Sequence, residues 1–376
     1  MSQLRTTIYW AALTLPLAAC APASAQPSPA AAFESRWRVT LAGPPAAPAA
    51  LDDTRAYVPL ENGTISALLL EDGQVVWNAP AETTVAPAAG QARVFVATGR
   101  DVRALDAASG REVWRITLET RVATALLFDA GWLFAGLDGG RVAALRAADG
   151  AVIWSIQTGA PLQAPAAPAG DRVYLPLTDG RVLAVALQTG DIVWTRALPG
   201  APSAILPLDD RLFVGSADNF FYCLSPSDGK NRWRVRTGGD ITGAPIVDES
   251  RVYFMSLDNL LRGLDRRNGW LRWQRPVPAR AVGGPLWTGP FVVIATLTSQ
   301  LHAFHRVTGA PAGSSPLPAA EGLESLLIAP PGLVTHQGRE GFVLLTRQGV
   351  LQLVGYADSG TSATGPVASP AAGLVR

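Results

Sequence analysis

Tryptophan recurs at a nearly constant interval through most of this chain. The repeat positions are Trp37, Trp77, Trp114, Trp154, Trp194, Trp233 and Trp273, separated by 40, 37, 40, 40, 39 and 40 residues. From Trp77 onward a glycine precedes each tryptophan by four residues, at Gly73, Gly110, Gly150, Gly190, Gly229 and Gly269. A fixed period of this length indicates a repeat protein whose units are small supersecondary structures packed against their neighbours.

Each unit contains a second turn motif about ten residues before its glycine. These motifs are Asn62-Gly63, Gly99-Arg100, Gly139-Gly140, Asp179-Gly180, Asp218-Asn219 and Asp258-Asn259. Such pairs tolerate the positive φ that tight hairpin turns require. The intervening segments, such as 172–177 and 181–186, are apolar or alternating. We therefore expect four short antiparallel strands per unit, which is the pattern of a β-propeller blade.

The number of units predicts an eight-bladed, all-β propeller. Seven units carry both turns, and an eighth is degenerate, with strands expected at 325–330, 333–337 and 342–347. Its turns are expected at Glu340-Gly341 and Gln348-Gly349. Trp37 stands one period before the first complete unit, so the strand at 36–41 is expected to form the outer strand of the last blade and close the ring. Alternatively, residues 350–356 could form the outer strand of the last blade.

The repeated tryptophans are interpreted as structural anchors. Each side chain can lie on its sheet and fill the wedge between two neighbouring blades. Burial of ~150–250 Å² of aromatic surface contributes at most about 4–6 kcal/mol per residue. One such anchor per blade explains the spacing without a ligand.

The N-terminal segment predicts export. Arg5 precedes an apolar run of about ten residues, which is too short to span a bilayer as a helix. The run ends in Leu17-Ala18-Ala19-Cys20, which resembles the lipobox of bacterial lipoproteins. Cys20 is therefore the predicted lipidation site. The alternative is an ordinary signal peptide cleaved near Ala23-Ser24-Ala25.

These signals divide the chain into four parts. Residues 1–19 are the expected lipoprotein signal peptide, and residues 20–32 are the lipidated cysteine with a flexible tether of Ala, Pro, Ser and Gln. Residues 33–356 form the predicted propeller. Residues 357–376 are expected to be a flexible C-terminal tail.

Charge and metal-ligating residues exclude several functions. The chain has 31 Lys and Arg against 30 Asp and Glu, so no general electrostatic attraction to nucleic acid is expected. His302 and His305 fall on opposite faces of an expected strand, which makes them a poor metal pair. Cys223 lies in an apolar run and is expected to be a buried structural thiol.

The unit at residues 104–114, ALDAASGREVW, resembles the tryptophan-docking repeat of the quinoprotein propellers. One branch of that family comprises dehydrogenases that hold pyrroloquinoline quinone and calcium. The resemblance to that branch would imply several oxygen ligands for calcium, a catalytic Asp and often a pair of adjacent cysteines. This chain has no adjacent cysteines, and most of its acidic residues fall in turns or at strand edges. The quinone-dependent dehydrogenase is therefore the least favoured hypothesis.

The other branch is the BamB lipoproteins, which have eight blades, no cofactor and no catalytic activity. This resemblance implies an outer-membrane lipoprotein, facing the periplasm, that assists a BamA-like protein in the assembly of β-barrels. Ala21 follows the cysteine, and by resemblance to the sorting rules of enterobacterial lipoproteins this residue favours the outer membrane. The family's two contact loops correspond to residues 159–165, with Leu162 as the apolar contact, and to the segment that begins at Asp240. A propeller lipoprotein that binds another envelope partner, or a small ligand such as a glycan, remains the alternative.

The segment from Asp228 to Arg280 is basic, with eleven Lys and Arg and six acidic residues. Arg232, Arg234 and Arg236 alternate with Trp233 and Val235, so they are expected to share one face of an outer strand. Such charges can simply protect a sheet edge from aggregation. They can equally dock an acidic partner or anionic lipid, and the sequence leaves both interpretations open.

Overall fold

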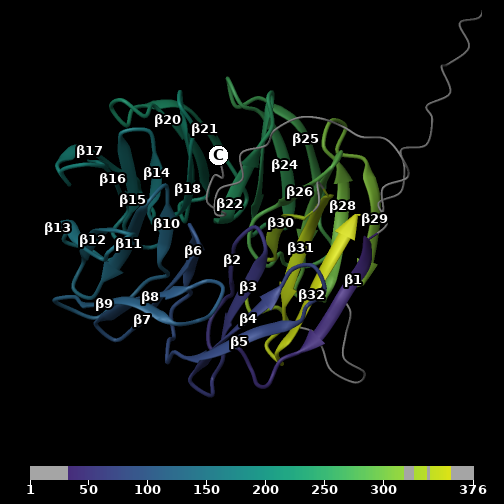
Figure 1. The fold of residues 1–376 in the computed structure, drawn as a ribbon. Coiled ribbons are helices and arrows are strands. Elements are labelled where there is room, and N and C mark those ends of the chain that lie inside the picture. The colour runs from purple at the N-terminus through teal and green to yellow at the C-terminus, as the bar shows by residue number, and fades with distance from the viewer. Residues whose placement is uncertain (1–32, 317–325, 337–338, 357–376) are drawn as a thin grey trace, which may run out of the picture.

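The computed structural model describes residues 33–316, 326–336 and 339–356. Within these ranges the chain forms eight antiparallel sheets of four strands each, arranged around a ring (Figure 1). The first strands of neighbouring blades contact one another, for example β14 with β18 and β18 with β22, which places the first strands on the inside of the ring. The predicted eight-bladed β-propeller is therefore confirmed.

Each blade runs from an inner strand to an outer strand in chain order. Blades 1 and 2 comprise β2 (Ala50–Leu51), β3 (Arg55–Pro59), β4 (Thr64–Leu69), β5 (Val75–Pro80), β6 (Ala88–Gly90), β7 (Arg93–Thr98), β8 (Asp101–Asp106) and β9 (Glu112–Thr117). Blades 3 and 4 comprise β10 (Leu127–Asp129), β11 (Trp132–Leu137), β12 (Arg141–Arg146), β13 (Val152–Gln157), β14 (Ala167–Ala169), β15 (Arg172–Pro176), β16 (Arg181–Ala186) and β17 (Ile192–Ala197).

The remaining blades follow the same order until the last one. Blades 5 and 6 comprise β18 (Pro202–Pro207), β19 (Leu212–Ser216), β20 (Phe220–Leu224), β21 (Asn231–Arg236), β22 (Ile241–Val247), β23 (Arg251–Ser256), β24 (Leu260–Asp265) and β25 (Leu271–Pro276). Blades 7 and 8 comprise β26 (Leu286–Thr288), β27 (Phe291–Ala295), β28 (Gln300–His305), β29 (Pro311–Pro316), β30 (Gly332–His336), β31 (Arg339–Leu345), β32 (Val350–Tyr356) and β1 (Phe33–Thr40). In the described part of the chain, no helix is long and apolar enough to cross a membrane.

The N-terminal strand closes the ring. In the last sheet β1 pairs with β32, and Figure 1 shows the purple N-terminal strand beside the yellow C-terminal one. Residues 350–356 are therefore the third strand of blade 8 and not its outer strand. The closure expected from the position of Trp37 is confirmed.

The inner half of blade 8 differs from the sequence prediction. The first strand is Gly332–His336 rather than 325–330, and Glu340 and Gly341 lie inside β31 rather than in a turn. Of the expected first strand, only Leu327 pairs with the sheet, through an isolated bridge to Thr346. This bridge corresponds to the one between Leu162 and Leu177 in blade 4. The error arose because this unit lacks a repeat tryptophan, so its register had to be set from weak turn signals alone.

Each repeat tryptophan docks on the following blade. The indole nitrogen donates a hydrogen bond to a backbone carbonyl of that blade in six cases: Trp37 to Leu70 (2.7 Å), Trp77 to Ala107 (3.0 Å), Trp114 to Ala147 (3.0 Å), Trp154 to Leu187 (2.8 Å), Trp194 to Pro226 (2.8 Å) and Trp273 to Arg306 (2.9 Å). The ring also lies on the turn glycine of that blade. At Gly190 a Cβ would stand 2.9 Å from the Trp154 ring, and φ is +79°. Glycine is thus required for both space and backbone conformation.

Trp233 departs from this pattern. Its indole nitrogen is buried and has no hydrogen-bond partner. The carbonyl that it would reach by analogy, that of Arg266, accepts a hydrogen bond from Arg211 of blade 5 at 2.5 Å instead. An arginine therefore replaces the indole as the donor at the contact between blades 5 and 6.

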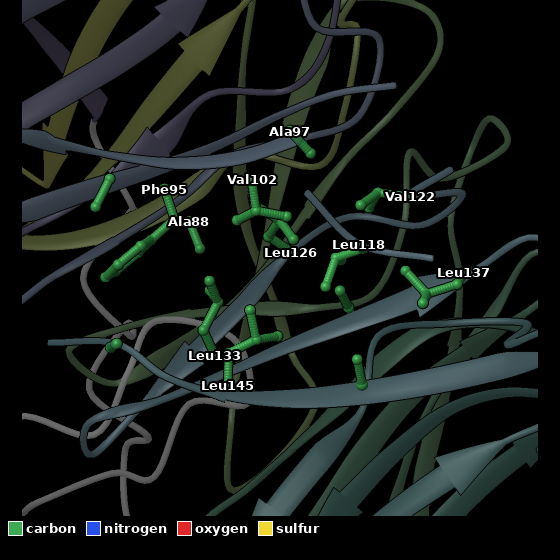
Figure 2. Packing of buried hydrophobic residues seen from close by; sticks show 14 residues of the cluster. Ala88, Phe95, Ala97, Val102, Leu118, Val122, Leu126, Leu133, Leu137 and Leu145 are labelled. Carbon is green, nitrogen blue, oxygen red and sulfur yellow. The ribbon is translucent and has the colours of Figure 1, made fainter. Parts of the chain in front are cut away.

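The hydrophobic core is divided among the wedges between blades. Figure 2 shows one wedge, in which Phe95 and Val102 of blade 2 face Leu133 and Leu145 of blade 3. The second strand often adds an aromatic ring beside the tryptophan of its own blade, as Phe95 does for Trp114 with ring centroids 5.9 Å apart. Interlocked wedges of this kind make the ring a rigid support for its loops.

Candidate functional site

The connections between blades gather at one end of the ring. Because the strands of each sheet are antiparallel, the segment that leaves the fourth strand emerges beside the turn between the second and third strands. We call this end the connection face; its inter-blade segments are 41–49, 81–87, 118–126, 158–166, 198–201, 237–240 and 277–285. Backbone bonds fasten these segments to the turns, as where Thr158 N donates to the Gly140 carbonyl at 2.8 Å.

Leu162 belongs to the core of the connection between blades 3 and 4. Its side chain is only 8% exposed and packs in the cluster that contains Val173, Leu175 and Leu177. It also reaches back to blade 3, where its Cδ1 lies 3.0 Å from the position that a Cβ on Gly136 would take. The side chain of Leu162 therefore offers little surface for the apolar partner contact that was predicted for it. The exposed residues of this connection are Gly159, Pro161, Gln163 and Pro165.

The same bridge recurs in other blades, which explains the burial of Leu162. Residues at its place in other connections form the corresponding isolated bridge, at Pro45, Val122, Ala281 and Leu327. Val122 precedes Leu162 by 40 residues, the period of the tryptophans. This spacing was the sequence signal that could have identified Leu162 as a repeat position.

Replacing Leu162 by alanine is expected to lower the free energy of unfolding by about 2–3 kcal/mol, since it leaves a cavity in a packed wedge. Urea denaturation measures the change. Gln163→Ala, in the exposed neighbour on the same connection, should change stability by less than about 0.5 kcal/mol. Equal stability of Leu162→Ala and the wild type would contradict the burial of this side chain.

Asp240 lies at the end of the connection between blades 5 and 6 and is half-exposed. Its backbone carbonyl accepts a hydrogen bond from Leu257 N at 2.8 Å, which fixes the segment against the turn of blade 6. Within the described ranges, no hydrogen bond or ion pair engages its carboxylate. Leu162 and Asp240 lie on the same face but on separate connections, with residues 198–201 between them in chain order.

A buried ion pair supports the Asp240 segment from blade 6. Arg262 donates to the Asp258 carboxylate, with Nη2 and Oδ2 2.5 Å apart, and both side chains are largely buried. Gly238 N donates to the same carboxylate at 2.9 Å, which ties the connection to this pair. Burial would raise the pKa of the Asp258 carboxyl, but the bonds from Arg262 and Ser256 outweigh burial and hold that pKa well below its usual value.

Sequence reasoning missed this network. It identified Asp258 only as a turn residue and gave no role to Arg262. The sequence signal was weak, because Arg262 occupies a strand position that is Ala143 in blade 3 and Leu183 in blade 4 but also an arginine, Arg103, in blade 2.

The acidic residues of the turns have structural partners. Asp72 accepts a hydrogen bond from Gln74 N at 2.9 Å, and Asp149 accepts one from Ala151 N at 3.0 Å. Asp179 and Asp228 accept equivalent bonds from the backbone two residues on. No group of three or more His, Cys, Asp or Glu side chains that could hold a metal ion occurs among the described residues.

The other residues considered for chemistry lie in strands and are buried or partly buried. His302 and His305 are partly buried in β28, and burial lowers the pKa of both imidazoles. Cys223 is fully buried in β20, and burial raises the pKa of its thiol to about 12. A thiol in that state is a poor nucleophile. Cys20 lies outside the described residues.

The fold and the docked tryptophans define a β-propeller of the quinoprotein repeat class. A sequence model of the family described as outer membrane protein assembly factor BamB matches residues 61–206 and 202–331. The match covers more than half of the chain, and the chain belongs to this family.

Solved structures agree with the fold. BamB from Moraxella catarrhalis superimposes with a TM-score of 0.70 at 17% identity, covering 88% of this chain and 100% of that one. A quinohemoprotein alcohol dehydrogenase from Pseudomonas putida HK5 gives 0.67 at 14% identity, covering 89% of this chain and 78% of that one. At such identities the likeness shows the fold alone. Comparison with curated proteins gives no match.

Proposed function

We propose that this chain is a non-catalytic scaffold lipoprotein that assists the assembly of outer-membrane β-barrel proteins. The observation that carries the proposal is the match to the BamB family over residues 61–331. The partner is the periplasmic part of a BamA-like protein. The structural bonds of the turn carboxylates support a role without catalysis.

The connection face is the proposed contact surface. Its segments are fastened to the turns by backbone hydrogen bonds, so a partner would meet a surface that needs little ordering. Asp240 supplies a carboxylate to that surface. Leu162 acts beneath the surface, where it holds the exposed Pro161 and Gln163 in place.

Pull-down of the periplasmic domains of the β-barrel assembly protein tests this role. The wild type should bind at micromolar concentration, and Asp240→Arg should weaken binding about tenfold, because it reverses a charge within the contact. Asp171→Arg is the matched control, since the Asp171 side chain is 90% exposed in a turn at the opposite end of the ring. Failure of the wild type to bind removes the proposed role. Equal binding by Asp240→Arg keeps the role but excludes this site.

The proposed membrane anchor is a lipid on Cys20, which places the propeller at the periplasmic side of the outer membrane. Cys20→Ala should move the protein from the membrane fraction to the soluble fraction, because a lipid chain gains about 0.8 kcal/mol per buried methylene. Fractionation and mass analysis of the N-terminal peptide measure this. Unchanged fractionation together with an N-terminal peptide that carries no lipid would contradict the anchor.

A further inference from the structure

The outer strand of blade 5 presents three exposed arginines. In β21, Arg232, Arg234 and Arg236 are exposed, whereas the intervening Trp233 and Val235 are partly buried and pack in the wedge toward blade 6. Since successive side chains of a strand point to opposite faces, Arg234 and Arg236 lie on the side of blade 5 that faces blade 4. Arg232 is the unpaired residue of a β-bulge, and it lines a cavity between blades 4 and 5 on the same side.

Contacts within blade 5 agree with this placement. Arg234 pairs with Tyr222 across the sheet, and its guanidinium carbon lies 4.7 Å from the centroid of the Phe220 ring. Tyr222 and Phe220 pack in the wedge that contains Trp194 of blade 4. Arg196 follows Trp194 by two residues in β17 and therefore shares its face. We call Arg196, Arg232, Arg234 and Arg236 the basic groove.

The charges of the basic groove lack the carboxylates that pair with arginines in other outer strands. Arg115 occupies in blade 2 the repeat position of Arg234. Its Nη2 atom lies 2.8 Å from Oε2 of Glu112, and its Nη1 atom lies 3.6 Å from Oδ2 of Asp101. Arg272, which holds in blade 6 the place of Arg232, lies 2.6 Å from Asp265. Over the described ranges, none of the four groove arginines forms an ion pair.

Two further observations show that the positive charges of the basic groove are poorly neutralised by nearby groups. The Nε atom of Arg196 is buried and has no hydrogen-bond partner. One nearby carboxylate is Asp210, whose pKa is lowered chiefly by a hydrogen bond from Arg211 and only to a smaller extent by Arg232. Its carboxylate is therefore already engaged by a different arginine. Asp218 is linked to Arg234 only through Tyr222, whose hydroxyl donates a hydrogen bond to the Asp218 carboxylate.

A cavity adjoins the groove. It has a volume of about 350 Å³, lies between blades 4 and 5, and is lined by Arg172 and Arg232 together with Asp171, Asp209 and Asp210. An uncharged side chain of a bound segment could enter this space beside Arg232, whereas a carboxylate would meet these aspartates.

We propose that the basic groove binds an extended acidic segment of a partner protein. Alternate residues of a strand are about 6.6–6.8 Å apart, and an extended peptide has the same repeat. Carboxylates at every second position can therefore meet Arg234 and Arg236 in register, and Arg232 lies beyond them at the β-bulge. A planar anionic membrane would instead favour unpaired basic residues spread over several blades. Of the two neighbouring outer strands, β17 exposes Ile192 and Val193, and in β25 Arg272 is paired with Asp265.

The full-length protein in detergent tests this proposal by fluorescence anisotropy with a labelled peptide of alternating Glu and Thr. The wild type should bind, and binding should weaken as salt rises. Arg234→Glu with Arg236→Glu should lower the affinity about tenfold or more. Arg115→Glu, the same place in blade 2, should change it by less than about twofold. Unchanged melting temperatures verify that the variants fold.

Three results would overturn the proposal. The first is no binding of the alternating peptide by the wild type. The second is an affinity of the double variant equal to that of the wild type. A loss of affinity in Arg115→Glu as large as in the double variant would count equally, since the effect would then come from overall charge. The third is binding only to phosphatidylglycerol vesicles, lost in the double variant, which would assign the groove to lipid. The test uses neither Cys20 nor the connection face, so its outcome is independent of the proposed function.

Discussion

Replacing Trp37 by alanine should lower the free energy of unfolding by about 3–5 kcal/mol, as for other large aromatic side chains in a core. Trp37 is distant in sequence from the rest of blade 8, but it docks on blade 1. Its Nε1 donates to the Leu70 carbonyl at 2.7 Å, and its ring would lie 2.7 Å from a Cβ on Gly73. The substitution therefore weakens the packing of blade 8 on blade 1, which adds to the pairing of β1 with β32 in closing the ring.

Thermal and urea unfolding of Trp37→Ala measure this effect. Trp270→Ala is the control, because the Trp270 side chain is 69% exposed and should contribute less than about 0.5 kcal/mol. If Trp37→Ala unfolds like the wild type, β1 does not contribute to closure.

The second large effect is expected at the buried ion pair of blade 6. Arg262→Met should destabilise the protein by about 3–5 kcal/mol, because it leaves the Asp258 carboxylate buried without its cation. The double variant Arg262→Met with Asp258→Asn should recover part of this loss, since no charge then remains unpaired. Arg115→Met, which breaks an ion pair whose arginine side chain is 50% exposed, should cost less than about 1 kcal/mol.

The contribution of the Asp258–Arg262 ion pair to the free energy of unfolding should depend on pH. The folded-state pKa of Asp258 lies below the unfolded value of about 3.9, so the pair stabilises the fold above about pH 4 and this contribution is lost as pH falls through the folded pKa. The difference in stability between wild type and Arg262→Met should therefore be largest near neutral pH and shrink toward about pH 3. A difference that is constant with pH would show that Arg262 acts through packing and not through its charge.

Much of the fold could be predicted because its determinants are local and periodic. The tryptophan and glycine recur at a fixed distance, and each turn pair carries its own conformational signal. Closure by β1 followed from Trp37 alone, since one repeat element stood a full period before the first blade. Where the anchors were missing, as in blade 8, the strand register was wrong.

The site was less predictable because exposure and pairing depend on several blades at once. The burial of Leu162 requires the packing of blade 4 against Gly136 of blade 3, although its 40-residue distance from Val122 hinted at a structural role. The alternation of Arg232, Arg234 and Arg236 was visible in the sequence. The lack of carboxylate partners, which separates these arginines from Arg115, required the positions of side chains on neighbouring strands.

The central claim is that this propeller works as a scaffold in the assembly of β-barrels. Copurification of the intact lipoprotein from detergent-solubilised envelopes tests it most directly. We expect a BamA-like protein to be recovered with the wild type in near-stoichiometric amount, and to be reduced with Asp240→Arg but not with Asp171→Arg. Recovery of the lipoprotein in good yield without any BamA-like protein would contradict the account.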